Sequence, residues 1–83
     1  MDAATLQIIV IRAWRAAFTD TQLQADSDFY DLGGDSYTAL RIADEVAAKL
    51  GLEAGDGELV ASIFECPTPQ EYASRVLELS AGS

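Results

Sequence analysis

The sequence predicts an all-α protein, a small bundle of three main helices and one short helix. Apolar residues recur at helical spacing in separate segments, and residues that favour helix starts and ends lie beside these segments. The chain has 83 residues, of which 49% are hydrophobic, so its composition is that of a folded protein. We expect residues 1–83 to form a single domain, which at this size buries about 60% of the surface of its unfolded chain. Such a domain has a small core and no room for a deep substrate cleft.

The first helix is expected over residues 4–18. Its apolar side chains form one stripe, while Arg12 and Arg15 lie on the other side of the helix. The stripe consists of Leu6, Val10, Ala13, Trp14, Ala17 and Phe18. Residues 19–35 then form a long connection, which is uncommon in a compact domain unless the connection is functional or held against the core. The side chains expected to hold it there are Leu23, Phe29 and Leu32.

The second helix is expected over residues 36–50. Gly51 can adopt the left-handed conformation that ends a helix, and Leu52 can then fold back onto the region of Val46. Lys49 lies in the last turn, where its charge suits the negative end of the helix dipole. The buried face is expected to consist of Ala39, Ala43, Val46, Ala47 and Leu50.

A flexible acidic loop, EAGDGE, is expected over residues 53–58 and is followed by a short helix over residues 60–65. Pro67 disfavours helical conformation at Cys66 and therefore ends this helix. The apolar residues that share helical spacing in this segment are Val60, Ile63 and Phe64.

The last helix is expected over residues 69–79. Thr68 caps it, Pro69 occupies the first helical position and Glu71 completes a capping box. Residues 80–83 are expected to form a frayed tail. The buried stripe is expected to consist of Tyr72, Val76 and Leu79, with Ala73 beside it.

Composition and charge exclude several kinds of chemistry. The chain has no histidine and a single cysteine, which excludes an internal disulfide, Ser-His and Cys-His nucleophile pairs and zinc sites built from His and Cys. Five Lys and Arg residues stand against fourteen Asp and Glu residues, a formal net charge of −9. This charge argues against nucleic acid and favours partner proteins with basic surfaces. No apolar run approaches the ~20 residues of a membrane span and no signal peptide is visible, so we expect a soluble cytoplasmic protein.

The stretch FYDLGGDSYTAL, residues 29–40, places Ser36 directly after Gly33, Gly34 and Asp35. Ser36 and Asp35 are both favoured helix caps and the glycines can simply permit a turn, so spacing alone favours a cap. A catalytic serine is disfavoured, because the chain has no histidine base and lacks the G-x-S-x-G pattern. The remaining possibility is an acceptor serine that another protein modifies with its own base and metal. The glycines would then leave the hydroxyl accessible, and the positive end of the helix would favour a phosphate there.

Residues 28–36, DFYDLGGDS, resemble the attachment motif of phosphopantetheine-dependent carrier proteins. The paired glycines of LGGDS are most similar to the peptidyl carrier (thiolation) domains of non-ribosomal peptide synthetases. The resemblance covers nearly the whole chain. Trp14 matches a tryptophan often found late in the first helix of this family, and residues 64–68, FECPT, resemble the F-E-x-P-T segment that precedes its last helix.

The resemblance implies an acyl-carrier-protein-like bundle with 4′-phosphopantetheine attached covalently to Ser36. A phosphopantetheinyl transferase would join this arm from coenzyme A to Ser36 Oγ through a phosphodiester, and the thiol of the arm would carry an aminoacyl or peptidyl group as a thioester. Asp35 resembles the family aspartate that can face basic groups or metal in the transferase, and Gly33 and Gly34 complete the attachment segment. The carrier would not be an enzyme, and no residue is assigned a catalytic or metal-binding role. Replacing Ser36 with alanine should abolish loading and, through loss of a cap, cost on the order of 1 kcal/mol.

The resemblance also implies a partner-facing surface beside the attachment serine. Tyr37 replaces the aliphatic residue more usual in the family, and we expect it at the surface with its hydroxyl in water. Leu40 follows on the same side of the helix, where it could face partners or the core. Arg41 is a lone positive charge beside the site, for which we expect a role in recognition.

The short helix is expected to contribute to the same surface. Val60 and Ile63 are expected to face partners, whereas Phe64 is expected in the core. The EAGDGE loop before this helix is a few residues longer than the usual family connection. Cys66 occupies a variable family position and is assigned no role.

The implied partners are the transferase, an adenylation enzyme, and condensation or tailoring enzymes, which a monomeric carrier would visit. The chain begins close to the first helix and ends just after the last, which suggests a free-standing carrier, although an excised domain would look the same. Three alternatives stay open: an acyl carrier protein of polyketide or fatty-acid synthesis, a calcium-binding protein, and a helical interaction module in which Ser36 is only a cap. The calcium alternative fits poorly, because the acidic residues from Asp26 onward do not follow the EF-hand pattern.

Overall fold

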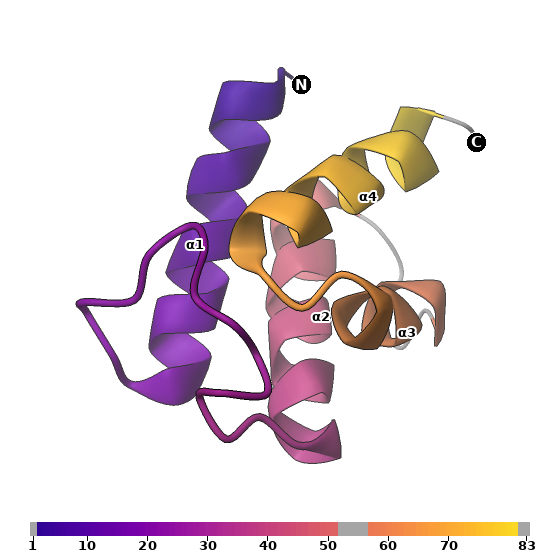
Figure 1. The fold of residues 1–83 in the computed structure, drawn as a ribbon. Coiled ribbons are helices and arrows are strands. Elements are labelled where there is room, and N and C mark those ends of the chain that lie inside the picture. The colour runs from indigo at the N-terminus through magenta and orange to yellow at the C-terminus, as the bar shows by residue number, and fades with distance from the viewer. Residues whose placement is uncertain (1, 52–56, 82–83) are drawn as a thin grey trace.

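The computed structural model describes residues 2–51 and 57–81, with side-chain environments as far as Leu79. The described residues form four α-helices and no strand, which confirms the predicted all-α fold. Figure 1 shows α1 and α2 standing side by side, with α4 passing across them and the short α3 at one side. The bounds of these helices are α1 Ala3–Phe18, α2 Ser36–Leu50, α3 Gly57–Glu65 and α4 Pro69–Ala81.

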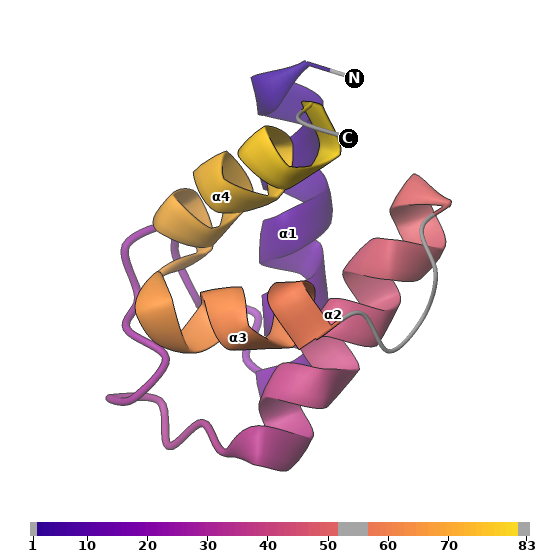
Figure 2. The same cartoon turned by 90° about the vertical axis from the view of Figure 1, so that its right-hand side faces the viewer.

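Each helix packs against two others. α1 contacts α2 and α4, and α3 contacts the same two helices, so that α3 closes the bundle opposite α1 (Figure 2). No helix in the described ranges is both long enough and apolar enough to cross a membrane.

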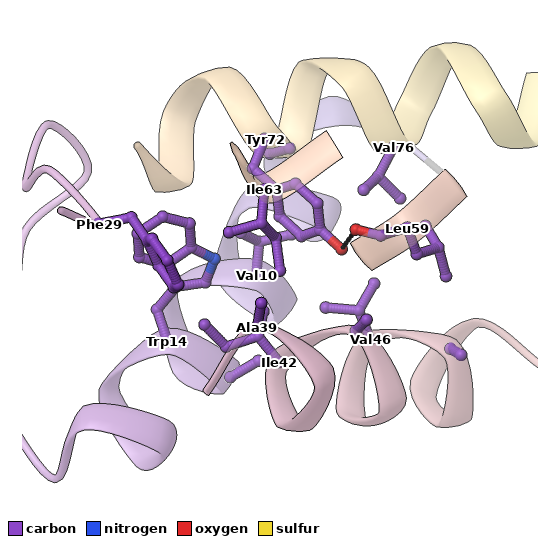
Figure 3. Close-up of a cluster of buried hydrophobic side chains, with 14 of the residues drawn as sticks. Val10, Trp14, Phe29, Ala39, Ile42, Val46, Leu59, Ile63, Tyr72 and Val76 are labelled. Carbon is purple, nitrogen blue, oxygen red and sulfur yellow. Dashed lines mark hydrogen bonds between the residues drawn. The ribbon is translucent and has the colours of Figure 1, made fainter. Parts of the chain in front are cut away.

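The core lies where one face of each helix meets the others (Figure 3). Trp14 is fully buried and contacts the Phe29 and Tyr72 rings, with centroids 5.7 and 6.3 Å away. The predicted stripe of α1 is buried as far as Trp14, while Ala17 and Phe18 are half-buried. Aromatic rings of three different segments thus meet at the centre of the bundle, where such pairs add to the stabilisation from buried area.

The face of α2 contains one core residue that the predicted stripe omits. Ile42 is fully buried together with the expected Ala39, Ala43, Val46 and Ala47, whereas Leu50 is half-buried. The helix ends as expected, because Gly51 takes the left-handed conformation with φ of 71° and its N–H bonds back to the last turn. The predicted contact of Leu52 lies outside the described residues.

The connection from 19 to 35 is held against the rest of the chain by side chains and by its backbone. Leu23 and Phe29 are buried as predicted, and Leu32 is half-buried. The Phe29 N–H donates to the Pro67 carbonyl at 2.6 Å, and the Gln70 N–H donates to the Ala25 carbonyl at 3.0 Å. The segment is therefore fixed to the junction between α3 and α4, although it has no regular secondary structure.

The short helix differs from the prediction in its start and in its orientation. α3 begins at Gly57, so Gly57 and Glu58 belong to the helix and not to the expected acidic loop, of which residues 53–56 lie outside the described ranges. The buried face consists of Ile63 and of Leu59, which is absent from the predicted set of Val60, Ile63 and Phe64. Because Leu59 and Ile63 face the core, the Phe64 side chain lies at the edge of the core and is partly exposed.

The buried position of Ser62 has a simple cause. Its hydroxyl donates to the Glu58 carbonyl one turn earlier at 2.6 Å, which satisfies the group inside the helix. Leu59 is hydrogen-bonded to another helix, because its carbonyl accepts a bond from the buried Tyr72 hydroxyl of α4 at 3.0 Å (Figure 3).

The last helix begins at the predicted cap and runs two residues further than expected, to Ala81. The Thr68 hydroxyl accepts from the Glu71 N–H at 3.2 Å and donates to the Glu71 carboxylate at 3.0 Å. Of the predicted tail, residues 80 and 81 are helical, and residues 82–83 lie outside the described ranges. The buried residues of α4 are Tyr72, Ala73 and Val76, while Leu79 is half-buried.

Candidate functional site

Ser36 is the first residue of α2, but it does not cap the helix. The cap is Asp35, whose carboxylate oxygen Oδ1 accepts from the Thr38 N–H and from the Thr38 hydroxyl, both at 2.9 Å. Ser36 is exposed, and no hydrogen bond engages its hydroxyl among the residues that the structure describes. The expected capping cost of removing the Ser36 hydroxyl is therefore corrected, because Asp35 alone performs the capping.

The two glycines before the site are required for two different reasons. Gly33 has a φ of 79°, in the left-handed region that glycine adopts readily, and its N–H donates to the Tyr30 carbonyl at 3.1 Å. Gly34 lies directly against the Phe29 ring, and a Cβ atom at this position would overlap the ring. The backbone of the turn before Ser36 thus packs directly on the buried Phe29 ring.

The carboxylates near Ser36 are engaged in the local backbone. Hydrogen bonds from the Thr38 N–H and hydroxyl lower the pKa of Asp35, which is therefore ionised at neutral pH and a poor general base. The Asp28 carboxylate accepts from the Tyr30 and Asp31 N–H groups at 2.8 and 3.2 Å. Within the described ranges, no cluster of three or more His, Cys, Asp or Glu side chains is arranged to hold a metal ion.

The predicted partner-facing residues divide into an exposed group on α2 and a less exposed pair on α3. Tyr37 and Leu40 are 68% and 43% exposed, and the exposed Arg41 guanidinium lies 5.9 Å from the centroid of the Tyr37 ring. Val60 is half-buried. Ile63 is fully buried, which contradicts its expected position at the surface and follows from its packing on the same face as Leu59.

Two aromatic residues that were not expected at the surface are exposed beside each other. Phe64, expected in the core, is 36% exposed, and Tyr30 is 55% exposed. Their ring centroids are 6.4 Å apart, and both rings pack against the buried Phe29 ring. The signal for Phe64 was present in the sequence, since a helix that starts at Gly57 buries Leu59 and Ile63 and turns Phe64 outward. No pattern in the sequence identified Tyr30 as a surface residue.

Cys66 has no reactive character in this environment. It is half-buried at the junction between α3 and α4, and burial raises the pKa of its thiol, with the negative charge of Glu71 acting in the same direction. The thiol is therefore protonated at neutral pH and a weak nucleophile.

We predict that Gly34→Ala destabilises the protein by about 1–3 kcal/mol, because the new methyl group forces the buried Phe29 ring to move. Urea unfolding followed by the fluorescence of Trp14 measures the change. Gly57→Ala is the control, since a Cβ at Gly57 meets nothing within 4 Å and its backbone conformation is ordinary. Equal stability of the Gly34→Ala variant and the wild type would contradict the proposed packing.

We also predict that Asp35→Ala lowers the midpoint of thermal unfolding at neutral pH by on the order of 5 °C, whereas Ser36→Ala changes it by no more than about 2 °C. The deficit of Asp35→Ala should shrink as the pH falls. A carboxylate whose pKa is lowered on folding stabilises the protein above its ordinary pKa of about 3.9, and this contribution is lost as the pH falls through the folded-state pKa. A larger loss for Ser36→Ala than for Asp35→Ala would show that the cap is misassigned.

Comparison with known proteins identifies the family. The sequence model of one protein family, described as "Phosphopantetheine attachment site", matches residues 9–76. The chain is 38% identical over 60 residues to a probable non-canonical nonribosomal peptide synthetase, CymA, of Salinispora arenicola, and 38% identical over 58 residues to the nonribosomal peptide synthetase agiA of Aspergillus flavus. These matches cover 72% and 70% of this chain but only 1% of each relative, and no solved structure gives a significant match. The chain belongs to the family of phosphopantetheine attachment domains, in which 4′-phosphopantetheine is bound covalently.

Proposed function

We propose that the protein is a peptidyl carrier, in which Ser36 bears 4′-phosphopantetheine and presents an aminoacyl or peptidyl thioester to the enzymes of nonribosomal peptide synthesis. The observation that carries this proposal is the exposed Ser36 hydroxyl, which no hydrogen bond engages within the described part of the chain. The similarity to two nonribosomal peptide synthetases supports the peptidyl class over the acyl carriers of polyketide and fatty-acid synthesis.

The residues around Ser36 fit the attached group. A phosphodiester on Ser36 Oγ would lie at the first turn of α2, where the helix dipole favours negative charge. Asp35 directs its carboxylate to Thr38 and so holds the first turn of the helix in place. When attached, the arm supplies a terminal thiol that carries the acyl group as a thioester.

The modification itself requires another protein. Oγ of Ser36 must lose its proton when the phosphodiester forms, and Asp35 is a poor base because its hydrogen bonds stabilise the ionised form. We therefore propose that a phosphopantetheinyl transferase supplies the base and the metal and binds coenzyme A, and that this chain supplies only the acceptor. Ser36 Oγ would form a bond to the pantetheine-side phosphorus of coenzyme A, the pyrophosphate bond would break, adenosine 3′,5′-bisphosphate would leave and the serine proton would pass to the base of the transferase. The carrier is accordingly a substrate in this step and not a catalyst.

The surface beside Ser36 supports recognition by several proteins. Tyr37, Leu40 and Arg41 form an exposed strip on α2 directly after the attachment residue. The half-buried Val60 lies on α3, which packs against α2. The net charge of −9 favours rapid association with enzymes whose docking surfaces are basic. We propose that the transferase, an adenylation enzyme and a condensation or tailoring enzyme use this surface in turn.

We expect one phosphopantetheine group to be added when the apo protein is incubated with coenzyme A and a transferase of broad specificity. Intact-mass spectrometry measures the addition. Ser36→Ala should stay at its unmodified mass, whereas Ser74→Ala, which removes an exposed hydroxyl on α4, should be modified as fully as the wild type. An unmodified wild type or a modified Ser36→Ala variant would refute the proposal.

The class of cargo is tested with the modified protein. We expect it to accept an aminoacyl group when it is incubated with ATP, the twenty amino acids and a panel of adenylation enzymes, and the thioester is seen as a further mass increase that hydroxylamine reverses. Loading only by acyltransferases with acyl-coenzyme A donors would place the carrier in the acyl class instead.

A further inference from the structure

We propose that Tyr30 is a positioning residue for the reaction at Ser36, because its hydroxyl ties the end of α3 to the segment that presents Ser36. This inference rests on the proposed function and adds a role for a residue that lies six positions before the acceptor serine. Tyr30 is 55% exposed, yet its hydroxyl donates to the Phe64 carbonyl at 3.0 Å.

The Phe64 carbonyl is a position where a hydrogen bond is needed. The last four carbonyls of a helix have no partner within the helix, and Phe64 lies in the last turn of α3, which ends at Glu65. A helix of nine residues is too short to be stable by itself, so its ends depend on groups from other segments. Tyr30 supplies such a group across 34 positions of the chain.

A second tyrosine hydroxyl is bonded to α3 near its other end, to a carbonyl that is not one of the last four of the helix. Near the start of the helix, the Leu59 carbonyl accepts the hydroxyl of Tyr72, a residue of α4 that is fully buried (Figure 3). α3 is thus held near each end by one tyrosine hydroxyl, and the two differ in accessibility. The Tyr72 bond belongs to the core, whereas the Tyr30 bond lies at the surface, where an approaching protein contacts it.

The Tyr30 bond is connected to Ser36 through the backbone. The Tyr30 N–H is held by the Asp28 carboxylate at 2.8 Å, and the Tyr30 carbonyl accepts the Gly33 N–H at 3.1 Å. The neighbouring Phe29 ring lies under Gly34 and packs against the Phe64 ring, with centroids 5.6 Å apart. The end of α3 and the turn before Ser36 therefore contact the same two residues, Phe29 and Tyr30.

A protein that modifies Ser36 is large enough to cover this region. A standard interface buries about 800 Å² on each partner, and the whole described surface of this protein is 4820 Å². An enzyme centred on Ser36 thus covers roughly one sixth of the surface, an area large enough to include the exposed Tyr30 ring, six positions before Ser36, and the Phe64 ring beside it. With the Tyr30 bond in place, the two sides of this footprint are already ordered before binding, which lowers the ordering cost of association.

The test compares Tyr30→Phe, which keeps the ring and removes only the hydroxyl, with the wild type. We expect the Glu65 and Cys66 amides to exchange with solvent about fivefold faster, because one exposed hydrogen bond is lost. We expect the KM of a phosphopantetheinyl transferase for the carrier to rise about fivefold with kcat unchanged, because Tyr30 does not touch the acceptor oxygen. Ser74→Ala is the matched control, since it removes another hydroxyl bond to a backbone carbonyl, on α4, and should match the wild type in KM.

Two results would overturn the inference. Unchanged exchange at Glu65 and Cys66 in Tyr30→Phe would show that the hydroxyl does not hold the end of α3. Faster exchange with an unchanged KM would show that the bond is structural only and does not position the site. If the wild type accepts no phosphopantetheine at all, the proposed function fails by itself, because the exchange measurement judges the Tyr30 bond independently of loading.

Discussion

The burial of the Phe29 ring beneath Gly34 is the contact on which the site depends. Phe29 is fully buried, its ring meets those of Trp14, Phe18 and Phe64, and its N–H is held by the Pro67 carbonyl. Since Gly34 has no side chain, the backbone can lie directly on the ring and reach α2 two residues later, at Ser36. A connection without regular secondary structure thereby gains a fixed end, and Ser36 lies at that end.

The different positions of the Asp35 and Ser36 side chains follow from this geometry. Asp35 satisfies the first turn of α2 with its carboxylate, so the serine next to it is not needed for capping and its hydroxyl stays in solvent. The hydrogen bonds that lower the pKa of Asp35 also make it unsuitable as a base. A residue pair that looks like two alternative caps in the sequence is therefore one cap and one exposed serine.

The periodicity of the sequence predicted the all-α fold, the buried stripe of α1 and the ends of α2, because a 3.6-residue repeat and a glycine after the last turn are local signals. For α3 it predicted the helix and its end at Glu65 but not its start, because Gly57 and Glu58 resemble part of a loop, and it missed Leu59, which forms the buried face with Ile63. The family motif pointed to Ser36, but only the structure separates the roles of Gly33 and Gly34. The bond between Tyr30 and Phe64 joins residues 34 positions apart, and no local pattern predicts it.

The central claim is that this bundle holds one hydroxyl, that of Ser36, accessible for attachment of the arm. The most direct measurement is fragmentation mass spectrometry of the wild-type protein after modification, which locates the phosphopantetheine within the chain. The account predicts that all of the group is found on Ser36 and none on Ser27, the other serine between Arg15 and Arg41. Phosphopantetheine on Ser27, Ser74 or any residue other than Ser36 would contradict it.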